Sequence, residues 1–172
     1  MFLSWCEWWV RRQFPGTPSI TTDELQDILD SSTPPQGPHG QSLSHHLILD
    51  ARGPEEFAVS HLPGAIRVDF NLEPAALATF LLNQAPEGAF QVQCVCYCSV
   101  GYRSAILTRA INDPATLTSD RFRALNVQGS VFKWAVEGRD LRDSNDQPVP
   151  YVHPYNRTFG LAVPRSLWRW TP

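Results

Sequence analysis

The sequence QCVCYCSVGYRS, residues Gln93 to Ser104, places a cysteine at every second position. In a β-strand alternate residues point to one face, so Cys94, Cys96 and Cys98 would lie in a row with steps of about 6 to 7 Å. That step is too long for a disulfide between neighbours, and the side chains point the same way rather than at each other. We therefore predict a strand from Gln91 to Tyr97, in which Cys94 and Cys96 are small apolar side chains of a sheet core.

A metal site at these cysteines is disfavoured by their spacing. Zinc sites gather ligands through tight C-x-x-C turns and add a second Cys or His pair, whereas here the pairs are C-x-C. The nearest histidines, His61 and His153, belong to unrelated segments. We expect neither a metal nor another cofactor.

Cys98 differs from the other two cysteines because a short loop follows it and runs into a helix expected from about Ser104 to Ile111. Backbone N–H groups can converge on a thiol at this place, bind an anion and favour the thiolate. Gly101 lets the loop close, and Arg103 adds a positive charge. The sequence thus predicts Cys98 as a nucleophile, with an anion-binding loop made of Ser99, Val100, Gly101, Tyr102, Arg103 and Ser104.

The rest of the central region alternates between strand and helix patterns. Strands are expected at Leu47–Asp50, Ala65–Val68 and near Leu125–Val127, and helices at Ala75–Asn83 and Val131–Glu137. This order predicts an α/β fold, a parallel sheet of about five strands with helices on both faces. A Pro/Gly/Ser-rich loop is expected at residues 31–42.

The two ends of the chain have a different composition. We divide the chain into an aromatic N-terminal segment (residues 1–18), a domain (19–142) and an arm rich in proline and aromatic residues (143–172) that packs on the domain. A short N-terminal helix would lay Trp5, Trp8 and Trp9 on the domain, or present them to a membrane surface or a protein partner.

Composition and charge exclude several classes of function. The net charge is −3 and the 14 basic residues are scattered, so we expect no nucleic-acid partner. No apolar run is long enough to span a membrane. Glu7 interrupts the N-terminal apolar residues and Arg11 and Arg12 follow them, the reverse of a secretory signal, so a cytoplasmic location is expected.

Three segments together resemble the rhodanese family, in order and spacing: LILDARGPEEFAVSHLPGAIRVDF, VCYCSVGYRSAI and NVQGSVFKWAVEGRDL. The resemblance covers roughly Ser19 to Leu141. It implies a five-stranded parallel sheet and a sulfurtransferase that carries sulfur as a persulfide on Cys98. The implied partners are a small sulfur donor or a persulfide-bearing protein, together with a thiol or other nucleophilic acceptor.

Departures from the family pattern leave alternatives open. Rhodaneses that use thiosulfate well tend to have basic residues just after the cysteine, where this chain has Ser99 and Val100, so we expect thiosulfate to be a poor donor. One alternative is a catalytically weak binding or regulatory module. Another is a phosphatase or arsenate reductase, but that chemistry needs an arginine six positions after the cysteine, and Arg103 lies five after Cys98.

A cluster of charged residues follows the first predicted strand. Asp50 and Arg52 end the first predicted strand, and Pro54-Glu55-Glu56 begins a short helix. We predict an ion pair of Arg52 with Glu55 or Glu56 rather than a catalytic role.

Overall fold

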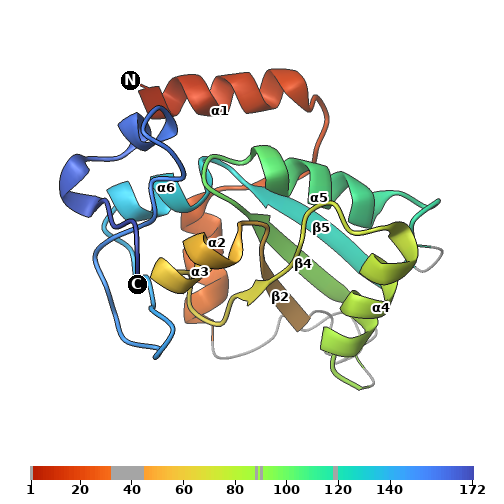
Figure 1. Ribbon diagram of the computed structural model, residues 1–172. Coiled ribbons are helices and arrows are strands. Elements are labelled where there is room, and N and C mark those ends of the chain that lie inside the picture. The colour runs from red at the N-terminus through yellow and green to blue at the C-terminus, as the bar shows by residue number, and fades with distance from the viewer. Residues whose placement is uncertain (1, 32–44, 88, 90, 118–119) are drawn as a thin grey trace.

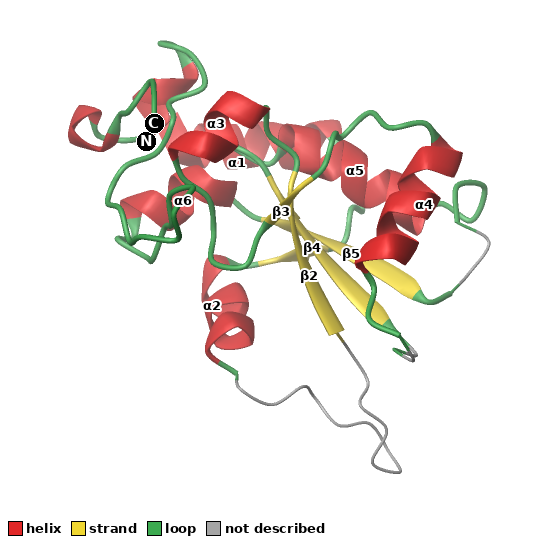
Figure 2. Ribbon diagram, turned by 60° about the horizontal axis from the view of Figure 1, so that its bottom comes forward, coloured by secondary structure: helices red, strands yellow, loops and turns green. Residues whose placement is uncertain are grey.

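A computed structural model describes residues 2–31, 45–87, 89, 91–117 and 120–172 of the chain. Its centre is a five-stranded sheet in the order β1-β5-β4-β2-β3, and every paired neighbour is parallel (Figures 1 and 2). The elements are α1 Phe2–Gln13, β1 Ser19–Ile20, α2 Thr22–Asp30, β2 His45–Asp50, α3 Pro54–Val59, β3 Ile66–Arg67, α4 Pro74–Gln84, β4 Val92–Tyr97, α5 Tyr102–Asn112, β5 Phe122–Val127, α6 Ser130–Val136, η1 Phe159–Ala162 and η2 Arg165–Leu167.

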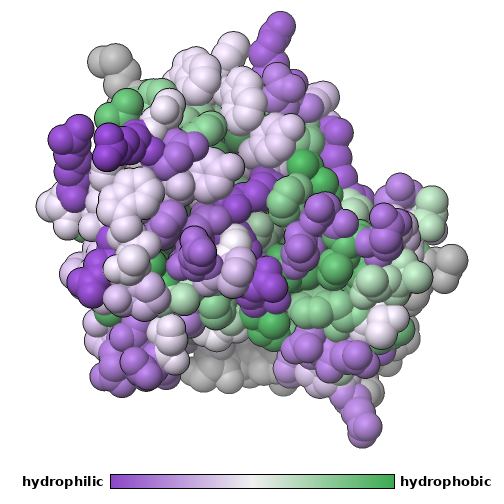
Figure 3. All heavy atoms as spheres, viewed as in Figure 1, coloured by the Kyte–Doolittle hydropathy of each residue, from purple (hydrophilic) through white to green (hydrophobic). Residues whose placement is uncertain are grey.

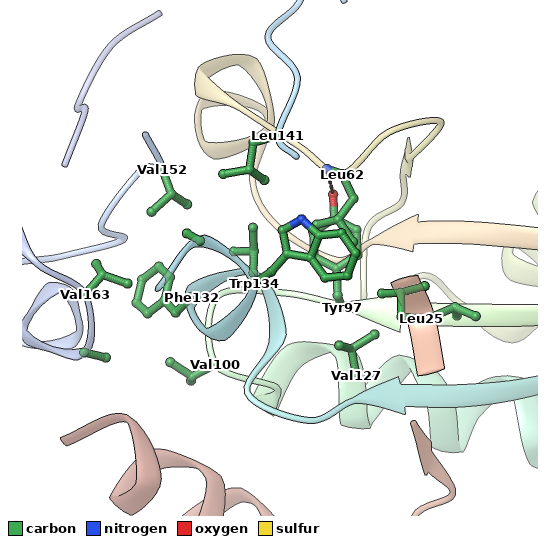
Figure 4. Close-up of a cluster of buried hydrophobic side chains, with 14 of the residues drawn as sticks. Leu25, Leu62, Tyr97, Val100, Val127, Phe132, Trp134, Leu141, Val152 and Val163 are labelled. Atoms are coloured by element: carbon green, nitrogen blue, oxygen red, sulfur yellow. Dashed lines mark hydrogen bonds between the residues drawn. The ribbon is translucent and has the colours of Figure 1, made fainter. Parts of the chain in front are cut away.

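Alternation along the central strand β4 builds a separate hydrophobic core on each face of the sheet. Cys94 and Cys96 face the core that contains Leu77 and Leu81 of α4 and Leu107 of α5. Val95 and Tyr97 face the opposite core, shown in Figure 4, which also contains Leu25 of α2 and Trp134 of α6. The α/β fold with helices on both faces, predicted from the sequence, is confirmed.

The burial of the first two cysteines is confirmed as well. Cys94 and Cys96 are both fully buried, and all four cysteines of the chain are free thiols. Their neighbours on this face are apolar, so they act as small core side chains.

Several element boundaries differ from those predicted. Helix α5 begins at Tyr102, two residues earlier than expected, because Gly101 adopts a left-handed conformation with φ 107° that ends the loop directly after the cysteine. Strand β5 starts at Phe122 rather than near Leu125, and the two-residue strand β1 was not predicted. Most of the loop expected at residues 31–42 lies outside the described residues.

The predicted partner of Arg52 is wrong. Arg52 is paired with Asp50, at 2.6 Å between Nη2 and Oδ2, and both side chains are fully buried. Arg52 also donates to the Ser60 carbonyl and lies over the Tyr97 ring. Only one residue separates Asp50, at the end of β2, from Arg52, so Arg52 pairs with this near neighbour rather than with a carboxylate of the helix that follows. Burial alone would lower the pKa of Arg52, but the charge of Asp50 and its hydrogen bonds with Arg52 have a larger effect and raise that pKa.

The terminal segments contact each other and the sheet domain. Helix α1 contacts η1, and the first and last parts of the chain lie next to each other in Figure 1. From the C-terminal segment, Val152 and Val163 enter the same buried cluster as Cys6 of α1. None of the helices among the described residues has the length and apolar character needed to cross a membrane.

Removal of one charge from the Asp50–Arg52 pair should strongly destabilise the fold. In Asp50→Asn a fully buried guanidinium loses its counter-charge, and we expect a loss of about 3 kcal/mol or more in the free energy of unfolding. Urea unfolding measures it. The matched control is Asp120→Asn, which removes an exposed pair with Arg123 and should cost less than about 0.5 kcal/mol. Equal effects of the two substitutions would contradict this account.

Candidate active site

Cys98 lies directly after β4, at the carboxyl end of the sheet's central strand. Ligand sites of open parallel sheets lie at this edge. The chain turns sharply there, since Ser99, Val100 and Gly101 alone separate Cys98 from the first residue of α5. The Cys98 residue is 1% exposed, so its thiol lies at the bottom of the site rather than on the surface.

The loop places hydrogen-bond donors on the Cys98 sulfur. The Gly101 N–H donates to Sγ at 3.2 Å. Burial alone would raise the pKa of Cys98, but the Arg103 charge, the Ser104 hydroxyl and the amides of Ser104 and Gly101 outweigh it and lower the pKa. The Ser104 hydroxyl is buried and has no other hydrogen-bond partner among the described residues, which leaves it available to a thiolate.

The pKa values of the two neighbouring cysteines are shifted in the opposite direction. Burial raises the pKa of Cys94 well above its ordinary value and that of Cys96 to about 12. Both therefore remain thiols at neutral pH, while Cys98 is the one of these three cysteines whose surroundings favour the reactive thiolate.

The turn between β5 and α6 fixes the backbone of the site. The Cys98 N–H donates to Ser130 Oγ at 3.1 Å, and the Cys98 carbonyl accepts from the Val131 N–H at 3.1 Å. Asn126 Nδ2 donates to the Gly101 carbonyl at 3.1 Å. Ser130 has a φ of 54°, in a region that side chains rarely adopt, directly after Gly129 at φ 70°. This strained turn thus holds the cysteine in place.

Arg103 is engaged by Glu56 from helix α3. Two of its nitrogens reach the two carboxylate oxygens at 2.7 and 2.8 Å, and Nη2 also donates to Ser99 Oγ at 2.9 Å. Burial would raise the pKa of Glu56, but the bonds from Arg103 lower it to about 2, so the carboxylate is ionised at neutral pH. The positive charge that the sequence placed beside the cysteine is therefore largely compensated.

Aromatic side chains from both ends of the chain surround the opening above Cys98. A hollow of about 180 Å³ is lined by Trp9, Cys98, Ser99, Val100, Tyr102, Arg103, Tyr155 and Phe159. Tyr102 stacks on Trp9 with ring centroids 5.1 Å apart, and Arg103 lies over the Tyr155 ring at 4.8 Å. Within the part of the chain that the structure describes, no group of three or more His, Cys, Asp or Glu side chains could hold a metal ion.

The structure brings most of the sequence-predicted residues together, though in different roles. Gly101 and Ser104 lie around the Cys98 sulfur, whereas the Ser99 hydroxyl donates a hydrogen bond to Glu56. Val100 is buried and belongs to the core in Figure 4, yet it also lines the hollow.

Sequence reasoning missed other residues of the site: Trp9, Glu56, Ser130, Tyr155 and Phe159. The PEEF and NVQGSVF segments carried a signal for Glu56 and Ser130, because both lie within the segments that resemble the rhodanese pattern. The aromatic residues lie outside those segments and carried no such signal.

The family model of the rhodanese-like domain matches residues 21–137. The chain belongs to the rhodanese-like domain family. The match includes β4, the Cys98 loop and the turn around Ser130, but ends before the C-terminal segment that carries Tyr155 and Phe159. Helix α1, with Trp9, precedes it. Of the four aromatic residues that line the hollow, Trp9, Tyr155 and Phe159 therefore lie outside the matched domain, and Tyr102 lies within it.

Solved structures with the same fold are distant in sequence. The thiosulfate sulfurtransferase from Pseudomonas aeruginosa aligns with 22% identity and a TM-score of 0.56 over 93% of this chain and 26% of its own. This chain thus spans only about a quarter of that protein. The BH2092 protein from Bacillus halodurans aligns with 14% identity and a TM-score of 0.50, over 74% of this chain and 78% of its own. No curated protein matches the sequence. At these identities the likeness shows a shared rhodanese-like fold alone.

The difference between the cysteines predicts their order of reactivity. Iodoacetamide should alkylate Cys98 fastest, with a pH dependence that reports a pKa below that of an ordinary thiol, because only its thiolate is stabilised. Peptide mapping by mass spectrometry at successive pH values measures this. Cys98→Ser should remove the fast phase and Cys96→Ala should keep it. A fast phase that disappears in folded Cys96→Ala protein would contradict the assignment.

Proposed function

We propose that this rhodanese-like domain is a sulfurtransferase that carries a sulfane sulfur as a persulfide on Cys98. In the first step the Cys98 thiolate attacks the sulfane sulfur of a donor, a bond forms from Sγ to that sulfur, and the donor's remaining part leaves with the electron pair. In the second step a nucleophilic acceptor attacks the outer sulfur, and Cys98 leaves as the thiolate. No redox cofactor is needed, because each step exchanges one bond to sulfur for another.

The observation that carries this proposal is the contrast between Cys98, directly after β4, and the two cysteines within that strand. Cys94 and Cys96 are closed in by apolar side chains, whereas Cys98 receives the Gly101 amide and opens to a hollow. The same donors that stabilise a thiolate stabilise the terminal sulfur anion of a persulfide. The unpartnered Ser104 hydroxyl adds a donor to this cradle.

The length of the loop favours sulfur over phosphorus as the reacting centre. Phosphoryl transfer must hold three equatorial oxygens in its transition state. Here the loop closes early, with Gly101 already hydrogen-bonded to Sγ, and Arg103 faces Glu56. A single sulfur atom needs fewer donors than a phosphoryl group, and this loop supplies fewer.

Incubation of the purified protein with a sulfane sulfur donor should add one sulfur atom to Cys98. Intact-protein mass spectrometry should show an increase of about 32 Da, the mass of one sulfur, that a thiol reductant reverses. Cys98→Ser should show no reducible adduct, while Cys94→Ala and Cys96→Ala should keep it and lose stability instead. An adduct that persists in Cys98→Ser would refute the proposal.

We further propose that thiosulfate is a weak donor because Glu56 compensates Arg103. A dianion that enters the hollow gains from each uncompensated cation nearby, and the carboxylate of Glu56 removes most of that gain. The buried Ser99 hydroxyl is also turned to Glu56, so it does not face the anion.

Neutralisation of Glu56 should improve the use of thiosulfate. In Glu56→Gln the charge of Arg103 is released, and we expect the KM for thiosulfate to fall by about threefold to tenfold, which corresponds to about 0.7 to 1.4 kcal/mol. Steady-state kinetics measure the change, and thermal unfolding verifies that the variant is folded.

Two controls separate charge from disruption of the loop. Glu55→Gln, at the exposed neighbouring position, should leave the KM unchanged. The double variant Glu56→Gln/Arg103→Gln removes both charges and should return the KM to the wild-type value or above. An unchanged KM in folded Glu56→Gln protein would show that backbone amides alone determine recognition of the donor.

A further inference from the structure

The hollow above Cys98 has walls that a compact dianion does not need. Four aromatic rings line it: Trp9 from α1, Tyr102 from α5, and Tyr155 and Phe159 from the C-terminal segment. They form two pairs. Trp9 and Tyr102 are nearly parallel, with 12° between their planes, whereas Tyr155 and Phe159 meet edge to face with centroids 5.8 Å apart.

The first pair belongs to a longer aromatic stack along α1. Trp5 stacks on Trp9 at 6.3 Å and Phe2 on Trp5 at 5.7 Å, so a row of rings runs along the helix and ends at the hollow. Phe14 supports Tyr102 from another side, edge to face at 5.0 Å. The rings of this wall are thus held in place by other rings, and α1, seen across the top of Figure 1, carries most of them.

The second pair is held by the backbone of the C-terminal segment. Tyr155 has a φ of 63°, which is rare for a bulky side chain. Its N–H donates to His153 Nδ1 at 3.0 Å, and its ring lies against Arg103. A left-handed residue of this kind needs support from its surroundings, and the result here is that the Tyr155 ring lies at the opening above Cys98.

The charge and the volume of the hollow restrict which ligands can bind in it. Besides the Cys98 thiolate, Arg103 is the one charged group among the described residues that line the hollow, and Glu56 compensates its charge. The volume of about 180 Å³ lies below the roughly 300 to 1,000 Å³ of pockets for drug-sized ligands, which suits one ring with a short substituent. Aromatic walls favour a flat ring, because stacked and edge-to-face contacts add to the burial of its apolar surface.

We propose that the two ends of the chain build a specificity site for a single flat aromatic ring on the sulfur donor, so that Cys98 takes sulfur from small aryl or heteroaryl sulfur compounds. This inference rests on the proposed sulfur transfer at Cys98. With an aryl thiosulfonate the thiolate bonds to the sulfane sulfur, the bond from that sulfur to the sulfonyl sulfur breaks, and the aryl sulfinate leaves with the electron pair. Atoms and charges balance without a further reactant.

A matched pair of donors tests the ring preference. Benzenethiosulfonate and methanethiosulfonate share the reacting group and differ in the ring. We expect the wild-type kcat/KM to be at least about tenfold higher for the aromatic donor. The ratio should fall toward one in Trp9→Leu and in Tyr155→Leu, which keep an apolar side chain but remove a ring.

The control variant is Trp8→Leu. Trp8 lies on the same helix, is 57% exposed and does not line the hollow, so its replacement should keep the ratio. An equal loss of the ratio in Trp8→Leu and Trp9→Leu would show an effect on α1 as a whole and would overturn the assignment of the ring site.

A binding measurement keeps this inference separate from the proposed chemistry. Calorimetry with Cys98→Ser should show tighter binding of benzenesulfinate than of methanesulfinate, and Tyr155→Leu in that background should remove the difference. If neither donor is turned over but this difference is found, the ring site stands and the proposed function fails. If both donors are turned over equally and both sulfinates bind equally, the proposed function stands and the ring site is overturned.

Discussion

The bidentate ion pair between Glu56 and Arg103 is the interaction on which the geometry of the site depends. It joins helix α3 to the first turn of α5, and its atoms also hold the Ser99 hydroxyl and the Gly53 amide. Because Glu56 is only 6% exposed, the pair is sheltered from solvent and stronger than a surface pair. The carboxylate thus fixes the direction of Arg103, and with it the field at the cysteine and the face offered to Tyr155.

The parallel sheet brings the other parts of the site together, because strands that run in one direction end at one edge. Asp50 ends β2 and forms the buried pair with Arg52, Cys98 follows β4, and Ser130 follows β5. These residues are distant in sequence but come from adjacent strands in the order β5-β4-β2. The cysteine therefore lies between a fixed ion pair and a strained turn.

Figure 3, in the same view as Figure 1, shows that the most hydrophobic surface on this side of the molecule lies over α4 and α5.

Local patterns predicted the fold and the position of the Cys98 loop, whereas contacts between distant segments could not be predicted. Period-two cysteines and one glycine were sufficient to place β4 and its loop, since both depend on neighbouring residues. The partner of Arg103 was missed because Arg103 and Glu56 are 47 residues apart and several carboxylates competed for each arginine. The convergence of Trp9 and Tyr155 on one hollow could not be predicted either. Composition indicates that aromatic residues pack against the protein, but it does not identify the residues that they contact.

The burial of every cysteine also determines how Cys98 would respond to oxidants. The other three thiols, Cys6, Cys94 and Cys96, are all closed off from solvent. Side chains two residues apart on one face of a strand are about 6 to 7 Å apart, too far for a disulfide without backbone movement. A sulfenic acid formed on Cys98 would therefore not condense readily with Cys96, and further oxidation to sulfinic acid would be irreversible. A carried sulfur atom would take the oxidation in place of Sγ, and later reduction of the sulfur–sulfur bond would return the thiol. In the proposed sulfur transfer, the persulfide is thus the state in which this cysteine would best survive peroxide.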